Sequence, residues 1–376
     1  MFKIAQNKEI DQQRPTILKT APSLWAIPLC LSMFGLLSIL SISTRSVHAG
    51  DGVAYALVYR QGLWLILGLV IMMTASAIPT DFWKRSSGIL WLFALILTFA
   101  TIFDFFGVEA GGARRWIRVG PLGFQPIELL SFSLVIHLSK IISGDEISRR
   151  KAFLKTMAIT LISLVPLFLQ PDMGGTILVF LIAMAIYVEA HGWFYPLITG
   201  TVLTPPFLYV LFMESYRIRR YTAFMDPWKE PLDSGFQVIQ GLIAFANGGV
   251  LGVGIGKGLQ KLSYLPAAHT DFIFASIGEE FGLIGTLSIV MLFALWSARI
   301  FRSYINNKII FERLLLWGMC ISVLLPFFIN VAGVTRLLPL TGMPLPFISY
   351  GGSSLVSTWL RTGLIIRIVW NMEISG

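Results

Sequence analysis

The sequence predicts an all-α polytopic membrane protein of about ten transmembrane helices, with one long extracytoplasmic loop between the seventh and eighth. Of its 376 residues, 55% are hydrophobic and only 13% are charged, and the mean hydropathy is +0.75. Soluble domains carry roughly 25% charged residues, so this chain lacks the polar surface that a soluble protein needs. Because each span takes about 20 apolar residues, we expect one membrane domain and no separate soluble domain.

Ten apolar windows supply the predicted spans. Two of them are weak: the fourth contains Glu128 and Lys140, and the sixth follows the fifth after only the turn QPDMGG. No internal repeat and no low-complexity linker divides the chain. The windows cover 23–43, 56–78, 88–106, 126–143, 154–170, 174–190, 193–213, 272–298, 313–333 and 349–370.

Basic residues set the predicted orientation. Lys3, Lys8, Arg14 and Lys19 precede the first window, which is too long for a cleaved signal peptide. Because cytoplasmic segments are enriched in Lys and Arg, the N-terminus is expected in the cytoplasm, and an even number of spans returns the C-terminus there. The expected division is a cytoplasmic tail at 1–22, a single ten-helix membrane domain at 23–370 with the extracytoplasmic loop 214–271, and a cytoplasmic tail at 371–376.

Composition argues against several other classes of protein. The net charge of +9 does not indicate nucleic-acid binding, since the basic residues lie between apolar runs, where they suit anionic lipid headgroups. Cys30 and Cys320 both lie in apolar windows, so neither a disulfide nor a thiolate metal site is expected. No two of the four histidines have the i, i+4 spacing of a zinc site, and we assign no metal ligands.

Basic residues are concentrated in two loops predicted to face outward, 107–125 and 214–271. The positive-inside rule disfavours exporting them. One explanation is that the second loop is long enough to escape this bias and that its acids pair with its bases. The other is an anionic ligand at the outer headgroup level, and the guanidinium fork fits phosphate or pyrophosphate best. The clustered bases are Arg114, Arg115 and Arg118 in the first loop and Arg217, Arg219 and Arg220 in the second.

The stretch GGVLGVGIGKG at 248–258 resembles a nucleotide-binding loop only superficially. A P-loop needs glycine where this chain has Leu251, and Ser or Thr where it has Gly258. A dinucleotide fingerprint also fails, because no strand is expected before it. We predict closely packed or flexible backbone, whose amides remain able to hold an oxyanion with Lys257 as an added charge.

Asp271 in LPAAHTDFIFASIGEEFGLIG lies where the long loop becomes a helix. An Asp at this position is often an N-cap. A carboxylate at the outer membrane boundary near exported bases is also a candidate functional group. Glu279 and Glu280 are expected about 12 to 14 Å further along the helix, buried and paired with a base on another helix.

Four further polar features have both a structural and a functional interpretation. Glu128 begins the fourth span after a proline, where it meets the helix dipole or faces a polar site inside the bundle. Asp172 in QPDMGGT has turn composition. His269 is expected to be a hydrogen-bonded interfacial residue. The TGMPLPF segment predicts a structured re-entrant loop, and SYGGSS close packing of the last helix.

Together these motifs resemble the SEDS family, the FtsW/RodA-like peptidoglycan glycosyltransferases, over about residues 60–365. The resemblance implies ten transmembrane helices and the polymerisation of lipid II, by inverting glycosyl transfer, at the outer face of the bacterial cytoplasmic (inner) membrane. It also implies undecaprenyl pyrophosphate as a product, and a class B penicillin-binding protein (transpeptidase) and divisome membrane proteins as partners. The strings that carry it are GGARRWIRVGPLGFQPIELL, QPDMGGT, FMDPWKEP with GFQVIQGLIAFANGG, LPAAHTDFIFASIGEEFG and LPLTGMPLPFISYGGSS.

The loop before Asp271 favours the division branch of this family over the elongation branch, because it reads Gly254-Ile255-Gly256 and then Gln260-Lys261-Leu262. Two positions depart from the family pattern. Ser131 stands where the family commonly has lysine, and Ala267 where it usually has glutamate. Glu128 therefore lacks its local counter-charge, and Lys140 is too far along the helix to replace it simply.

By this resemblance Asp271 is the catalytic residue, and we expect it to act as the general base. The expected substrate-binding residues are Arg115, Arg217, Arg220, Lys257, His269, Glu128 and Asp172. No cofactor is required by the sequence, although a divalent cation (Mg or Mn) bound through Asp271 would share the stabilisation of the leaving group. Two alternatives stay open: a lipid II flippase, which needs polar sites reachable from both faces, and a non-catalytic division scaffold.

Overall fold

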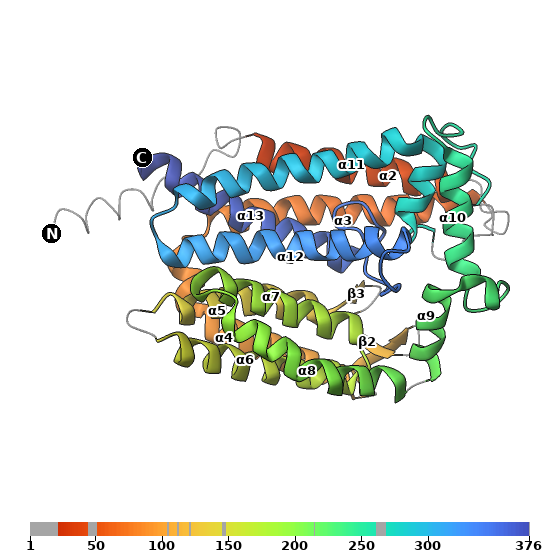
Figure 1. The fold of residues 1–376 in the computed structure, drawn as a ribbon. Coiled ribbons are helices and arrows are strands. Elements are labelled where there is room, and N and C mark those ends of the chain that lie inside the picture. The colour runs from red at the N-terminus through yellow and green to blue at the C-terminus, as the bar shows by residue number, and fades with distance from the viewer. Residues whose placement is uncertain are drawn as a thin grey trace.

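The computed structural model describes residues 22–43, 51–103, 105–110, 113–119, 122–144, 148–213, 215–260 and 268–375. Ten long helices of this described part run along a single bundle (Figure 1), which confirms the all-α membrane fold predicted above. Six of them, α2, α3, α6, α7, α11 and α12, are long and apolar enough to cross a membrane. The ten are α2 Ser23–Ser43, α3 Asp51–Ala77, α4 Thr80–Ala100, α5 Pro126–Ile142, α6 Arg149–Leu169, α7 Met173–His191, α8 Phe194–Met213, α11 Ile273–Asn306, α12 Ile310–Val334 and α13 Gly352–Ser375.

The chain returns to the end of the bundle from which it starts. Helix α2 begins, and α13 finishes, at one end, called here the terminal end (Figure 1). The small sheet, α9 and α10 lie at the opposite end, called here the loop end. This arrangement agrees with an even number of spans, and the cytoplasmic location of the terminal end stays a prediction.

Both stretches expected as outward loops contain secondary structure. The first forms a three-stranded antiparallel sheet of β1 Gly107–Ala110, β2 Ala113–Val119 and β3 Leu122–Phe124, in the order β1-β2-β3. The second contains α9 Ser215–Met225, the 3₁₀ turn η1 Pro227–Lys229 and α10 Phe236–Gly248. Strand β2 (ARRWIRV) is rich in β-branched and aromatic residues, which fit a pleated surface. A hydropathy window as long as a membrane span does not detect elements this short.

Helix α11 is broken at Gly282, where φ is 65° and ψ is −161°. Straight, its 34 residues would measure about 51 Å, well beyond a hydrocarbon core of about 30 Å. The break places the first turns of α11 beside α10 at the loop end (Figure 1). The part in line with the bundle therefore begins at Leu283, so the predicted span 272–298 starts about three helical turns too early.

The glycine-rich stretch supplies the backbone hydrogen bonds that this break removes. The amides of Val253 and Gly254 donate to the carbonyls of Glu279 and Glu280, both at 3.0 Å. The amides of Leu283 and Ile284 donate back to carbonyls of the same stretch, at 2.9 and 3.3 Å. Every backbone polar group at membrane depth needs such a partner. The packed-backbone interpretation of the glycine-rich stretch thus agrees with the structure.

The two acids of the GEE sequence lie at the loop end and not deeper in the bundle as expected. Glu279 accepts hydrogen bonds from the amides of Leu259 and Gln260, at 3.0 and 3.1 Å, and from the Asn247 side chain at 3.2 Å. Glu280 accepts from the hydroxyl of Ser41 at 2.7 Å and from a loop amide at 3.2 Å. Through the contacts with loop amides, the two acids anchor the glycine-rich stretch to α11, and the expected pairing with a base stays a prediction.

Candidate functional site

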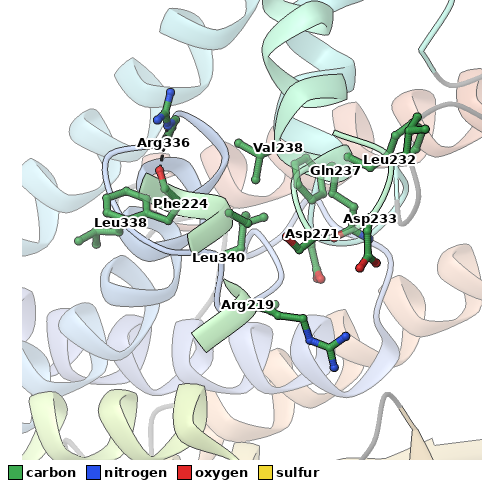
Figure 2. Close-up of a pocket in the computed structure, with 16 residues that line it drawn as sticks. Arg219, Phe224, Leu232, Asp233, Gln237, Val238, Asp271, Arg336, Leu338 and Leu340 are labelled. Carbon is green, nitrogen blue, oxygen red and sulfur yellow. Dashed lines mark hydrogen bonds between the residues drawn. The ribbon is translucent and has the colours of Figure 1, made fainter. Parts of the chain in front are cut away.

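A cavity of about 470 Å³ opens at the loop end of the bundle (Figure 2). Four parts of the chain meet there: α9, the segment from Leu232 into α10, the residues directly before α11, and the end of α12 with the chain that follows it. Asp271 lies on its wall, just before α11. The lining residues are Arg219, Ala223, Phe224, Leu232, Asp233, Ser234, Phe236, Gln237, Val238, Asp271, Phe272, Gly333, Arg336, Leu338, Leu340 and Gly342.

The lining mixes charged and apolar side chains. Figure 2 shows Asp271, Asp233 and Leu232 on one side of the view, with Phe224, Leu338 and Arg336 on the other and Arg219 below Asp271. Asp271 is half-buried, whereas Arg219 and Asp233 are exposed. Such a cavity provides a carboxylate and a guanidinium beside an apolar surface, which suits a ligand with both a polar and a hydrocarbon part.

Arg336 joins α9 to the chain that follows α12. Its Nε donates to the carbonyl oxygen of Phe224 at 3.0 Å and its Nη2 to that of Met225 at 2.7 Å. A cation suits this place, because the last carbonyls of a helix are unsatisfied and carry the negative end of the helix dipole. Arg336 therefore holds the helix that presents Arg219 to the cavity.

Asp271 is not the N-cap of α11. The N-cap position is Phe272, and the helix begins at Ile273. The carbonyl oxygen of Asp271 accepts a hydrogen bond from Nδ2 of Asn330 at 2.9 Å. A Cβ placed on Gly342 would lie 3.5 Å from Oδ2 of Asp271, so this glycine borders the carboxylate. The N-cap alternative is thus wrong.

The stretch after α12 folds back into the bundle, as the re-entrant prediction requires. Leu345, Phe347 and Ile348 are buried, and the Phe347 ring packs edge-on against Trp359 of α13 with centroids 5.5 Å apart. Gln61 of α3 clamps this stretch, since its side chain donates to the carbonyl of Ser349 at 3.0 Å and accepts from a following amide. The loop is therefore anchored to helices on both sides.

His269 lies next to the re-entrant loop and outside the cavity lining of the described chain. Its carbonyl accepts from the amide of Tyr350 at 2.9 Å, and the two rings pack edge-on with centroids 5.7 Å apart. Burial lowers the pKa of the imidazole below its usual 6.5, so the ring is neutral near pH 7. The described hydrogen bond of His269 is made by its backbone carbonyl, so the interfacial and the substrate-binding interpretations of its side chain both stay predictions.

Two predicted substrate ligands pair with each other. Nη1 of Arg115 on β2 lies 3.5 Å from Oδ1 of Asp172. Asp172 is buried and caps α7, accepting the amide of Gly175 at 3.1 Å. This geometry agrees with the turn interpretation of Asp172, and neither residue belongs to the described lining of the Asp271 cavity.

Glu128 is neutralised by a residue that sequence reasoning did not consider for it. Nη1 of Arg361, on α13, lies 3.2 Å from Oε2 of Glu128. Nη2 of the same guanidinium donates to the hydroxyl of Ser131 at 2.7 Å, and Nη1 also donates to the Ser357 hydroxyl. Arg361 is 3% exposed, and a buried charge of this kind needs a partner in a membrane domain. The polar-site interpretation of Glu128 thus agrees with the structure, with Ser131 as an acceptor in place of a cation.

The remaining predicted cations are distributed differently from the expectation. Lys257 is exposed on the glycine-rich stretch and lies outside the described cavity lining. Arg217 and Arg220 lie on α9, but their side chains fall outside the described residues. Arg219, between them, is the one of the three whose described side chain lines the cavity.

Sequence reasoning missed Arg219, Arg336, Asp233 and Asn330 as residues of the site. A signal existed for Arg219, since it belongs to the YRIRR cluster, and for Asp233, which was considered only as a partner for loop bases. Asn330 and Arg336 carried no local signal, because their contacts depend on residues 59 and 112 positions away.

Comparisons with known proteins agree on one family. A family model for cell cycle proteins (FtsW, RodA and SpoVE) matches residues 22–373. "Probable peptidoglycan glycosyltransferase FtsW" of Coxiella burnetii (strain RSA 493 / Nine Mile phase I) is 34% identical over 96% of this chain and 100% of its own length. The protein of the same name from Geobacter sulfurreducens (strain DL-1 / KN400) is 36% identical over 96% of both chains.

Solved structures share the fold. A chain of a peptidoglycan synthase complex, described as coordinating polymerization and crosslinking, superposes with a TM-score of 0.80 at 27% identity, covering 94% of this chain and 99% of that one. The rod-shape-determining protein RodA of Thermus thermophilus superposes with a TM-score of 0.71 at 26% identity, covering 94% of this chain and 98% of that one.

Proposed function

The chain belongs to the SEDS family of cell cycle proteins (FtsW, RodA and SpoVE), and we propose that it is a peptidoglycan glycosyltransferase that polymerises lipid II into β-1,4 glycan strands during cell division. The relatives named above support the activity, and their name supports the division branch. The observation that carries the proposal is the position of Asp271 on the wall of an open cavity that Arg219 also lines.

The proposed reaction is a single displacement with inversion. The 4-hydroxyl oxygen of one lipid II forms a bond to the anomeric carbon of the lipid-linked donor. The bond from that carbon to pyrophosphate breaks, and undecaprenyl pyrophosphate leaves with its electron pair. Asp271 takes the hydroxyl proton as the general base. Since a pyrophosphate leaves without protonation, the chemistry requires one base and a source of positive charge.

Arg219 is the described cation that supports the leaving group in this proposal, by a charge-assisted contact with its phosphates. Arg217 and Arg220 on the same helix stay proposed ligands. A divalent cation is an alternative source of charge, with Asp271 and Asp233 as its carboxylates. Among the residues that the structure describes, no group of three or more His, Cys, Asp and Glu residues is arranged to hold a metal ion.

The proposed setting is the bacterial inner membrane, with both chain ends in the cytoplasm and the cavity at the outer face. A class B penicillin-binding protein is the proposed transpeptidase partner, because a structural relative belongs to a synthase complex that couples polymerization to crosslinking. Growing strands made at the cavity would then emerge on the side where crosslinking takes place.

The test is polymerisation of purified lipid II by the protein in liposomes, together with its transpeptidase partner. Asp271→Asn should abolish polymer while wild-type amounts of folded protein and of complex are retained. Asp226→Asn is a matched control, since the Asp226 side chain caps η1 by accepting the amide of Trp228 at 3.2 Å and lies outside the described cavity lining. Near-normal polymer from Asp271→Asn would refute the proposed base. Wild-type translocation of lipid II across the bilayer without polymer would instead support the flippase alternative.

A further inference from the structure

Three consecutive carbonyl groups that lead into Asp271 are each held by a different donor. The carbonyl of His269 accepts from the amide of Tyr350 at 2.9 Å, and that of Thr270 from the hydroxyl of Ser349 at 2.7 Å. The carbonyl of Asp271 accepts from Nδ2 of Asn330 at 2.9 Å. This segment precedes the first turn of α11, so contacts from other parts of the chain determine its position.

Asn330 binds both pieces of backbone that border the Asp271 carboxylate. Besides the carbonyl of Asp271, its Nδ2 donates to the carbonyl of Met343 at 2.7 Å. Met343 directly follows Gly342, the residue that approaches Oδ2 of Asp271. Asn330 is 4% exposed and lies on α12, so this helix carries the bridge.

Ser349 forms the second bridge between the same two segments. Its hydroxyl donates to the carbonyl of Thr270 and accepts the amide of Leu345 at 2.8 Å. Gln61 in turn holds the carbonyl of Ser349 at 3.0 Å. The cavity wall around Asp271 is therefore cross-linked by side-chain hydrogen bonds from α3, α12 and the re-entrant loop.

A general base needs this kind of support, because a displacement of about 1 Å from the reacting proton can cost on the order of 100-fold in rate. We propose that Asn330 is a positioning residue for Asp271: through its two hydrogen bonds it sets the distance between the Asp271 backbone and the Met343 backbone, and so the place of the carboxylate in the cavity. Ser349 supports the same geometry. This inference rests on the proposed glycosyltransferase function.

Asn330 holds the two backbone segments through its side-chain amide donors. The effect of a substitution on kcat should therefore depend on whether the new side chain can donate hydrogen bonds. Asn330→Asp keeps the shape but places an acceptor against two carbonyl oxygens, whereas Asn330→Ala removes the bridge. A matched control is Asn371→Ala. Asn371 donates to the buried Glu312 at 3.2 Å at the terminal end of the bundle, so the control also loses a partly buried amide hydrogen bond, far from the cavity.

The experiment measures kcat and KM for lipid II polymerisation by the complex with its transpeptidase partner, with thermal unfolding of each variant alongside. We expect kcat to fall at least about tenfold in Asn330→Ala and further in Asn330→Asp, while KM changes less than about threefold. Asn371→Ala should lose thermal stability without this fall in kcat. Ser349→Ala should show the same signature as Asn330→Ala, and it carries the test where Asn330 variants fail to fold.

Three outcomes decide the inference. The positioning role would be overturned if kcat of Asn330→Ala and of Ser349→Ala stayed within about threefold of that of Asn371→Ala. If Asp271→Asn were inactive in the same experiment, the proposed function would remain intact. An active Asp271→Asn variant would overturn the proposed function itself. A rise in KM at unchanged kcat would assign Asn330 to substrate binding and also overturn the positioning role.

Discussion

Arg361 and Glu128, which are 233 residues apart in the chain, form an ion pair of 3.2 Å between α13 and α5. Their pairing explains how the chain keeps an acid inside a membrane domain with serine at position 131. The same guanidinium reaches the Ser131 hydroxyl, so a small acceptor and a cation from another helix satisfy the site together.

Removing one partner of this ion pair is expected to destabilise the folded protein. Arg361→Ala leaves the carboxylate of Glu128 without a counter-charge, which should lower the free energy of unfolding by about 3–5 kcal/mol. Arg299→Ala is the control, because the side chains of Arg299 and of its partner Glu373 are 29% and 39% exposed, and it should cost about 0–1 kcal/mol. Thermal unfolding in detergent compares the two, and equal losses would argue against the buried pair as a special contact.

The break in α11 should not tolerate a side chain at Gly282. A Cβ there would lie 2.4 Å from the amide nitrogen of Gly252, and its positive φ is unfavourable for alanine. Gly282→Ala should therefore lower the free energy of unfolding by at least about 2 kcal/mol. Gly62→Ala in α3 meets nothing within 4 Å and should leave the melting temperature unchanged or slightly raised. A melting curve of Gly282→Ala that matches wild type would contradict this account of the break.

Stability should depend on pH through His269. Burial lowers the pKa of its imidazole in the folded state below 6.5, so the unfolded chain binds the proton more tightly. The stabilising contribution of the neutral ring is complete above about pH 6.5 and is lost as the pH falls through the folded-state pKa. When the pH is lowered from 8 to 5, the melting temperature of His269→Gln should fall less than that of the wild-type protein. Parallel losses in the two proteins would exclude His269 as a source of the pH dependence.

Complementation separates the two branches of the family. We expect the gene for this chain to relieve filamentation in a bacterium depleted of its division polymerase, and not the rounding of one depleted of its elongation polymerase. Growth with the Asp271→Asn variant would favour the scaffold alternative. Rescue of rounding alone would assign the chain to elongation.

Particular residues show how far local patterns reach. Hydropathy windows found all ten long helices but missed β2, because a segment of seven residues that includes three arginines gives no membrane signal. The HTDFIF motif predicted that Asp271 lies between a loop and a helix. No local pattern predicted which residues lie near it in the cavity. Arg219 arrives on α9, which Arg336 holds by contacts formed across 112 residues.

The sequence by itself determined the membrane class, the ten helices and the segment that carries Asp271, because hydropathy and short motifs act over windows of about ten to twenty residues. Only the tertiary structure decided which charges meet: Arg361 with Glu128, Arg115 with Asp172, and Arg219 with the cavity of Asp271. The physical reason is that a buried charge takes whichever partner the packed helices bring within reach, and helix packing is set by contacts between segments far apart in the chain.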